Sequence, residues 1–290
     1  MAAWNDGYWW SKDGIRLHYR DYLPTTDAPA GRPPILCLHG LTRNARDAAS
    51  LAEWLAEQGW RVICPEMRGR GDSGYAKDPM SYVPLVYLQD LEALLDDQAI
   101  GRFAAIGTSL GGMLTMLLSA AGPGRIAAAV LNDIGPRLDE AGLGRIKTYV
   151  GRGGSWPTWL HAARAIAETN AAAFPGYAIE DWLAMAKRLC RLTPAGRIVF
   201  DYDMKIAEPF RVPGGEAGFD LWPAFESLRD VPVLLVRGAI SDLLSAETAA
   251  EMAVRLPGLE EIVVPGTGHA PTLDEPEVRA AIAGLLARVE

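Results

Sequence analysis

The sequence has few of the residues that build disulfide frameworks and metal sites. Its three cysteines, Cys37, Cys64 and Cys190, are an odd number at wide spacing, which fits buried thiols in a reducing compartment better than disulfides. None of them lies on a sharp strand-to-helix turn, which argues against a cysteine nucleophile. There is no H-E-x-x-H motif and no cysteine–histidine cluster, and Gly69 and Gly71 lack the rest of a G-x-G-x-x-G motif. We therefore predict no metal and no cofactor.

Positive charge and long hydrophobic runs are also lacking. The formal net charge of −8 argues against nucleic acid or an anionic membrane surface as a partner. No apolar run reaches the length of a membrane span, and the opening residues M-A-A-W-N-D-G-Y-W-W show no basic segment followed by an apolar one. We therefore expect a cytoplasmic protein that acts on a small molecule, without a nucleic-acid or membrane partner. A homodimer is left open.

What the chain does contain is a regular alternation of strand-like and helix-like segments. Over its 290 residues, 49% are hydrophobic and 22% charged, as in an ordinary globular protein with a large core. Two strand-like segments, Tyr8–Ser11 and Ile15–Tyr22, suggest a hairpin. Short apolar runs then alternate with helices over 35–132 and again over 233–289. This pattern predicts an α/β fold with a doubly wound, mostly parallel sheet of about eight strands flanked by helices.

The alternation breaks in the middle of the chain. From Arg137 to Trp222 the sequence shows helix-like segments at Glu140–Val150, Thr158–Thr169 and Ile179–Leu192, and a weak strand at Arg197–Phe200. We predict an α/β core of residues 1–136 and 223–290 with a helical cap, or lid, inserted at 137–222. The cap is close to neutral, so it does not require a strongly anionic substrate, although Arg145 or Arg152 could still bind a carboxylate.

Residues 103–113, F-A-A-I-G-T-S-L-G-G-M, combine an apolar strand, a sharp turn and the start of an apolar helix. Gly107 to Gly111 form a G-x-S-x-G motif with Ser109 at the turn. In this context the motif is typical of a nucleophile elbow, which lifts a serine hydroxyl above the sheet. Flanking glycines fit because strand and helix pack closely there. We therefore predict that Ser109 is a nucleophile.

A serine hydroxyl needs a base within hydrogen-bond reach, and the sequence offers four histidines. His18 lies in the predicted hairpin and His161 in a predicted cap helix, where structural roles are expected. His39 follows a core strand, and His269 lies in the loop after the last strand. Loops at the carboxyl ends of parallel strands meet at one edge of the sheet, where such folds keep their sites. His269 is therefore the predicted base.

The carboxylate that orients this base has two candidates at the same edge. Asp242 follows the strand at Val233–Val236, and Asp133 follows the strand that ends near Asn132. We assign the role to Asp242 and keep Asp133 as the alternative.

Together these segments resemble the α/β-hydrolase fold family, and in particular its capped, esterase-like or lactonase-like serine hydrolases. The resemblance covers nearly the whole chain. It rests on the H-G-x motif at His39–Leu41, the R-G-x-G-x-S loop at Arg68–Ser73, the elbow, and the order Ser109, Asp242, His269.

The resemblance implies a catalytic triad of Ser109, Asp242 and His269. It further implies an oxyanion hole formed by the backbone N–H groups of Leu41 and Leu110, with His39 as a structural part of its loop. Glu66 stands where the family usually has aspartate, and a structural role is expected for it. A serine nucleophile disfavours the dehalogenases and epoxide hydrolases of this fold.

The cap is expected to shape a pocket for a small to medium, moderately apolar substrate. The candidate pocket residues are His39, Thr42, Trp156, Trp159 and Trp182. Three functions remain open: a carboxylic ester hydrolase working through an acyl-enzyme, a lactonase, enol-lactonase or C–C bond hydrolase with the same triad, and a non-catalytic ligand-binding protein. An intact serine–aspartate–histidine set favours the first two.

Overall fold

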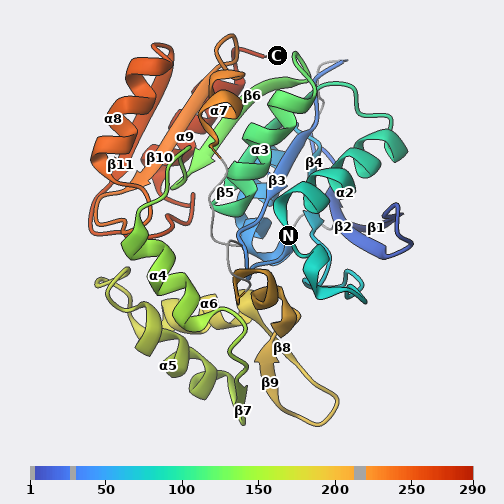
Figure 1. The fold of residues 1–290 in the computed structure, drawn as a ribbon, viewed down its shortest axis with the longest axis vertical. Helices are drawn as coiled ribbons and strands as arrows, with labels where there is room; N and C mark the ends of the chain where they lie inside the picture. Colours follow the sequence, from blue (N-terminus) through green and yellow to red (C-terminus); the bar gives the residue numbers. More distant parts are fainter. Residues whose placement is uncertain (1–3, 27–30, 212–219, 290) are drawn as a thin grey trace.

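The structure, a computed structural model, describes residues 4–26, 31–211 and 220–289. An eight-stranded sheet crosses the molecule in the order β1-β2-β4-β3-β5-β6-β10-β11 (Figure 1). Strands β4, β3, β5, β6, β10 and β11 pair in parallel with one another, whereas β1 and β2 are antiparallel to their neighbours. The strands are β1 (Asn5–Trp10), β2 (Arg16–Tyr22), β3 (Ile35–Leu38), β4 (Val62–Glu66), β5 (Phe103–Thr108), β6 (Ile126–Asn132), β10 (Val233–Gly238) and β11 (Leu259–Val264). This arrangement confirms the predicted doubly wound, mostly parallel sheet and its hairpin.

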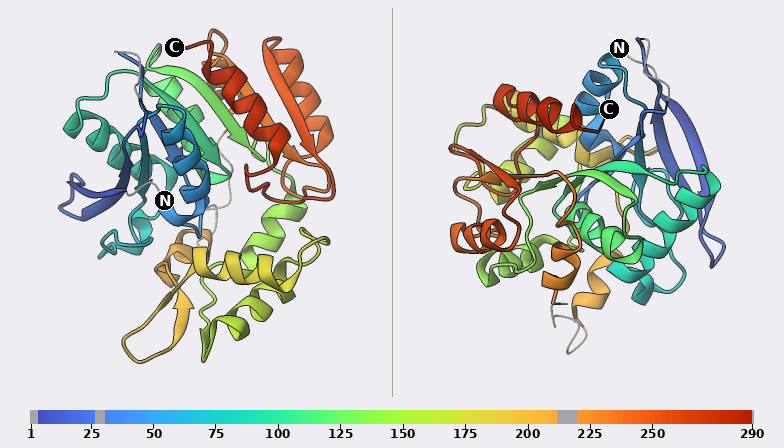
Figure 2. Two further views of the ribbon diagram at one scale, coloured as in Figure 1. Left: turned by 180° about the vertical axis from the view of Figure 1, so that it is seen from behind. Right: turned by 90° about the horizontal axis from the view of Figure 1, so that it is seen from above.

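Helices cover both faces of the sheet (Figures 1 and 2). One face carries α2 (Pro84–Asp97), α3 (Leu110–Ala121), α7 (Trp222–Glu226) and α8 (Ala246–Arg255), and the other carries α1 (Ala49–Glu57) and α9 (Pro276–Leu286). Each layer packs a separate apolar cluster against the sheet. Central strands such as β3 and β6 are buried along their whole length, which explains why they read as unbroken apolar runs. Short 3₁₀ turns η1 (Ala45–Ala48) and η2 (Pro79–Ser81) follow β3 and β4.

Between β6 and β10 the chain leaves the sheet and builds the cap, which lies at one end of the sheet, below it in Figure 1. Its elements are α4 (Glu140–Tyr149), β7 (Ser155–Trp156), α5 (Trp159–Asn170), α6 (Ile179–Leu189), β8 (Cys190–Leu192), β9 (Ile198–Phe200) and η3 (Met204–Arg211). The predicted helices are present, and so is the weak strand at 197–200. Residues 212–219 of the predicted insertion lie outside the described residues, and its bounds at 137 and 222 stay a prediction.

One feature of the cap differs from the expectation. The helix predicted to reach Leu192 ends at Leu189, because Cys190–Leu192 pairs with β9 in a three-stranded sheet of order β7-β9-β8. These strands are two or three residues long, so they lack the alternation of apolar and polar residues by which strands are recognised.

The cap has a hydrophobic core of its own, and it is bound to the main domain by polar contacts and by apolar side chains such as Val150 and Ile206. Its aromatic side chains pack on one another, with the Tyr177 and Trp182 ring centroids 5.0 Å apart. The Arg46 side chain donates to the carbonyl oxygens of Arg188 and Cys190 and to Asp201, at 3.1, 3.3 and 2.6 Å. In the part of the chain that the structure describes, no helix has the length and apolar character to cross a membrane.

Candidate active site

Ser109 occupies the turn between β5 and α3 in a strained backbone conformation. Its φ of 54° and ψ of −116° lie where residues with a side chain are rarely found. Strand and helix approach so closely that a Cβ on Gly107 would lie 2.4 Å from the Gly111 carbonyl carbon. A Cβ on Gly111 would lie 2.0 Å from the Leu38 carbonyl oxygen. Both glycines of the G-x-S-x-G motif are therefore sterically required, and the turn has the geometry of a nucleophile elbow.

The structure brings Ser109 and His269 together, although they are 160 residues apart in sequence. The His269 Nε2 atom lies 2.9 Å from the Ser109 Oγ atom, and the opposite ring nitrogen, Nδ1, lies 2.8 Å from Asp133 Oδ2. Since a carboxylate can only accept, Nδ1–H donates to Asp133, and Nε2 is left to accept the serine proton. This is the hydrogen-bond order that a serine nucleophile with a histidine base needs.

Asp133, the alternative carboxylate of the sequence analysis, is the one that contacts His269. Its side chain is buried, and its Oδ1 atom accepts the Gly238 backbone N–H at 2.8 Å. Oδ2 accepts the Ser241 hydroxyl at 2.6 Å in addition to the histidine. A carboxylate can accept about four hydrogen bonds, and Asp133 accepts three. These hydrogen bonds stabilise its buried negative charge. Ser241 was not among the predicted site residues. Its position next to Asp242, in the loop after β10, was the one feature of the sequence that indicated it.

The assignment of Asp242 as the partner of His269 is wrong for this structure. Asp242 instead forms a two-point ion pair with the cap residue Arg145, at 2.5 and 2.9 Å. The hydrogen bond from Arg145 holds the pKa of the Asp242 carboxyl below its ordinary value, against the effect of burial. Helix α4 packs directly on this loop, since a Cβ on Gly142 would lie 2.5 Å from the Asp242 carbonyl oxygen. The loop therefore turns Asp242 toward the cap while Gly238 and Ser241 face Asp133.

The two amides expected to form an oxyanion hole flank the serine. Leu110 begins α3 directly after Ser109, and Leu41 lies in the loop after β3. This loop lies against the elbow, because a Cβ on Gly40 would be 3.7 Å from the Ser109 Cβ atom. Among the hydrogen bonds of the described residues, none uses the N–H group of Leu41 or of Leu110. Both donors are thus free to bind an oxygen atom beside Ser109.

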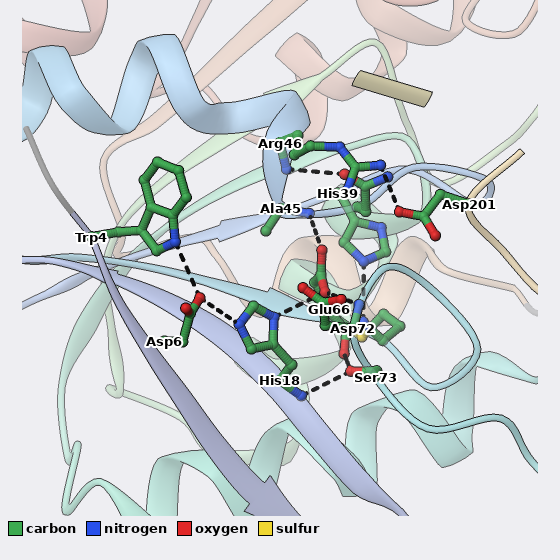
Figure 3. Close-up of polar contacts among 12 residues, drawn as sticks. Trp4, Asp6, His18, His39, Ala45, Arg46, Glu66, Asp72, Ser73 and Asp201 are labelled. Carbon is green, nitrogen blue, oxygen red and sulfur yellow. Dashed lines mark hydrogen bonds and ion pairs between the residues drawn. The ribbon is translucent and has the colours of Figure 1, made fainter. Parts of the chain in front are cut away.

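His39 holds this loop in place, and Figure 3 shows its ring beside the Glu66 network. Its Nδ1–H donates to the Gly40 carbonyl at 2.7 Å, and its Nε2 accepts the Met67 backbone N–H at 3.1 Å. Burial lowers the pKa of His39 to about 4, so the ring is neutral at pH 7. This agrees with the structural role that the resemblance implied.

The same figure shows why Glu66 is structural. Its carboxylate accepts the backbone N–H groups of Ala45 and Asp72, at 3.0 and 2.6 Å, and lies 2.9 Å from His18 Nδ1. The His18 Nε2 atom reaches Asp6 at 3.0 Å. Oxygen and nitrogen atoms of His18, Glu66 and Asp72 lie within 4.8 Å of one another, a spacing that a metal could use. Both Glu66 oxygens and both His18 nitrogens already have hydrogen-bond partners within the protein. These hydrogen bonds are enough to explain why the three side chains lie together.

A cavity of about 390 Å³ opens over Ser109 and His269, between the sheet edge and the cap. Of the five predicted pocket residues, His39, Thr42 and Trp156 line it. The prediction is wrong for Trp159 and Trp182, which do not line the cavity. Both pack into the cap's own core, where Trp182 is 5% exposed. At helical spacing an aromatic residue on the buried face cannot be told from one on the pocket face by sequence alone.

Comparisons with known proteins agree with the fold described above. The family model for the alpha/beta hydrolase fold matches residues 33–276. A crystal structure of an alpha/beta hydrolase from Novosphingobium aromaticivorans superposes with a TM-score of 0.94 at 59% identity and covers 100% of both chains. The chain is also similar to the 3-hydroxybutyrate-oligomer hydrolase of Cupriavidus necator, with 35% identity over 269 residues and 90% of each chain covered.

A more distant relative is the 2-(acetamidomethylene)succinate hydrolase of Mesorhizobium japonicum, 27% identical over 248 residues, which are 85% of this chain and 84% of that one. The chain belongs to the α/β-hydrolase fold family, among relatives that are hydrolases and esterases.

Proposed function

We propose that the protein is a serine hydrolase that cleaves carboxylic esters through an acyl-enzyme intermediate. The observation that carries the proposal is the hydrogen-bonded line Ser109–His269–Asp133, with distances of 2.9 and 2.8 Å. A nucleophile, a base and an orienting carboxylate in this order are the parts that acyl transfer requires. In this proposal Asp133 takes the role that the sequence analysis gave to Asp242.

The proposed reaction has two halves. Ser109 Oγ attacks the ester carbonyl while its proton moves to His269 Nε2, and Asp133 stabilises the imidazolium that forms. His269 then gives this proton to the departing alcohol, which leaves an acyl group on Ser109. A water molecule that loses its proton to His269 cleaves the acyl-enzyme, releases the acid and restores the serine.

The backbone N–H groups of Leu41 and Leu110 would stabilise the oxyanion in both halves. Neither N–H group is used elsewhere among the described hydrogen bonds. Both can therefore donate to the developing negative charge without first breaking another hydrogen bond. A single donor of this kind is typically worth about 10²–10³ in rate. Substituting either leucine side chain changes the shape of the site but keeps the donor.

The cavity and the relatives favour a small to medium ester. A volume of about 390 Å³ is near the lower end of known ligand pockets, and the walls mix apolar side chains such as Ile146 and Phe174 with polar ones. The Cupriavidus relative is named for 3-hydroxybutyrate oligomers, whose units carry the hydroxyl and carboxyl groups that an ester joins. These observations support ester cleavage over the other reactions of the fold.

The test is turnover of a 4-nitrophenyl ester series from acetate to decanoate, beside a small panel of lactones. Ser109→Ala should lower kcat by about 10⁵-fold or more, and a fluorophosphonate probe should label the wild type but not this variant. Near-wild-type turnover by a clean Ser109→Ala preparation would rule the mechanism out. A strong preference for lactones would keep the triad but change the substrate class.

A matched pair of variants separates the two carboxylates. Asp133→Asn should lower kcat by about 10³–10⁴-fold, because the amide would turn His269 into the wrong tautomer. Asp242→Asn makes the same change of charge and volume in the adjacent loop, and it should leave kcat within about threefold, since Asp242 bonds to Arg145. The reverse result would restore the original assignment.

A further inference from the structure

Four arginines from distant parts of the sequence line the cavity that contains Ser109. They are Arg43 of the main domain and the cap residues Arg145, Arg152 and Arg188. Two aspartates, Asp47 and Asp274, also line it. The cap as a whole is close to neutral, so this concentration of positive charge is a property of the folded cavity and not of the segment's composition.

Two of these arginines are held by a single carboxylate. Arg43 Nε donates to Asp47 Oδ2 at 2.8 Å, and Arg188 Nε lies 3.5 Å from Asp47 Oδ1. Burial acts against ionisation of Asp47, but its two cationic partners bring the pKa of its carboxyl below the ordinary value. One negative charge thus faces two positive ones, and this corner of the cavity keeps a net positive charge.

The ends of both guanidinium groups remain available to a ligand. Among the described contacts, each group meets Asp47 through Nε, and no hydrogen bond is formed by the terminal Nη atoms of Arg43 or Arg188. Both side chains are about a quarter exposed, at 26% and 27%, and both line the cavity. Terminal guanidinium nitrogens held at a fixed angle match the two oxygens of a carboxylate.

The stem of Arg43 lies beside the reacting serine. A Cβ on Gly40 would be 3.2 Å from Arg43 Cγ and 3.7 Å from Ser109 Cβ, so the stem of Arg43 and the nucleophile flank the same backbone position. Gly40 directly precedes Leu41, whose N–H is a proposed oxyanion donor. A substrate whose carbonyl lies at Ser109 would therefore lie close to Arg43, and Arg188 lines the same cavity.

The other two arginines are less suited to this task. Arg145 uses Nε and Nη2 to bind Asp242, which neutralises it. Arg152 lines the cavity from the turn after α4, but its side chain is exposed to solvent. Neither is oriented by Asp47.

We propose that Arg43 and Arg188 bind a carboxylate of the substrate, so that the preferred substrates are esters that also carry a free carboxylate, with Asp47 as the positioning residue. This rests on the proposed ester hydrolysis and names its substrate class. A single carboxylate at this position would neutralise the residual charge of the Arg43–Asp47–Arg188 group.

The test compares two esters that differ in charge but hardly in shape: the 4-nitrophenyl half-ester of glutarate and the neutral 4-nitrophenyl 5-methylhexanoate, whose isopropyl end replaces the carboxylate. The readout is the ratio of their kcat/KM values, with Ser109→Ala as the background. The wild type should prefer the half-ester by tenfold or more. Arg43→Gln and Arg188→Gln should each lower the ratio about 10–100-fold, since each removes a charge-assisted hydrogen bond.

Arg152→Gln is the matched control, because it removes an equal charge from the same cavity outside the Asp47 pair. Its ratio should stay within about threefold of the wild type. An equal drop in all three variants would mean a diffuse field and overturn the assignment, as would a wild type that prefers the neutral ester. Arg188 lies on a cap helix apart from the elbow, so its variant serves if Arg43→Gln does not fold.

A second measurement does not depend on turnover. Glutarate should bind to Ser109→Ala by calorimetry, and the Ser109→Ala/Arg43→Gln double variant should bind it about tenfold or more weakly. If neither ester is cleaved but this difference is present, the proposed reaction fails and the carboxylate site stands. If both esters are cleaved with equal efficiency and glutarate does not bind, the reaction stands and the carboxylate site fails.

Discussion

His39 should make the folded protein sensitive to acid by an amount that its surroundings determine. Both ring nitrogens are used by backbone groups, as a donor to Gly40 and as an acceptor from Met67, so a second ring proton has no partner. Burial lowers the pKa of His39 from 6.5 to about 4. Because the pKa is lower in the folded state than in the unfolded state, the associated stability is complete above pH 6.5 and is lost as the pH falls toward 4.

The size of this effect follows from the shift. Between pH 6.5 and 4 the unfolded chain binds a proton at His39 that the folded protein takes up only as the pH reaches its pKa of about 4. This difference costs the folded state about 3 kcal/mol at pH 4 relative to pH 7. The informative variant is His39→Gln, since an amide can still donate to the Gly40 carbonyl and accept from the Met67 N–H but does not titrate.

The assay is the free energy of unfolding in urea for wild type and variant at pH 7, 6, 5 and 4. Titration of the carboxylates is common to both proteins and cancels in the difference. The wild type should lose about 3 kcal/mol relative to the variant between pH 7 and 4. A difference that changes by less than about 0.5 kcal/mol would refute the reasoning, because it would mean that the buried ring accepts a proton without cost.

Three further predictions concern other parts of the fold. Carboxylates around the buried His18 outweigh the effect of burial and raise its pKa. The protonated ring therefore stabilises the folded protein fully below pH 6.5, and this contribution is lost as the pH rises above the raised pKa. His18→Gln should flatten the fall in unfolding free energy between about pH 6.5 and 9. Gly111→Ala should lower stability by about 3 kcal/mol or more or prevent folding, whereas Gly144→Ala, in open space on α4, should raise the melting temperature slightly. Trp182→Ala should cost about 3–5 kcal/mol in stability without changing ester chain-length preference, whereas Trp156→Ala, in the cavity wall, should extend it toward longer esters.

The parts of the fold that could be predicted from the sequence are those with a local cause. Strands β3, β5 and β6 are apolar because both of their faces are buried, and the elbow needs its glycines because Gly107 and Gly111 touch backbone atoms. Such requirements are visible within ten residues of chain. They were sufficient for the sheet, the position of Ser109 and the loop that carries His269.

The choice between Asp133 and Asp242 could not be made in this way. Strands β6 and β10 are adjacent and parallel, so both aspartates lie at the same edge of the sheet. They differ because of the path of the loop after β10. In this loop Gly238 and Ser241 donate to Asp133, whereas Asp242 binds Arg145, 97 residues earlier in the chain. The arginine pair around Asp47 is hidden for the same reason, since Arg188 comes from the cap.

These contacts also show that the cap and the reacting groups are positioned by the same loops. The N–H of Gly268, next to His269, donates to the cap carbonyl of Ala173 at 2.6 Å. Asn44, in the loop that follows Leu41, donates to the carbonyl of Arg188 at 3.0 Å, and Asp242 binds Arg145 beside Ser241.

Each loop that supplies a reacting or supporting group therefore carries a neighbouring residue that binds the cap. A displacement of the cap would move the histidine loop, the oxyanion loop and the support of Asp133 together. Variants that break several of these contacts at once should for this reason lower kcat as well as raise KM, whereas a cap that only enclosed the substrate would affect KM alone.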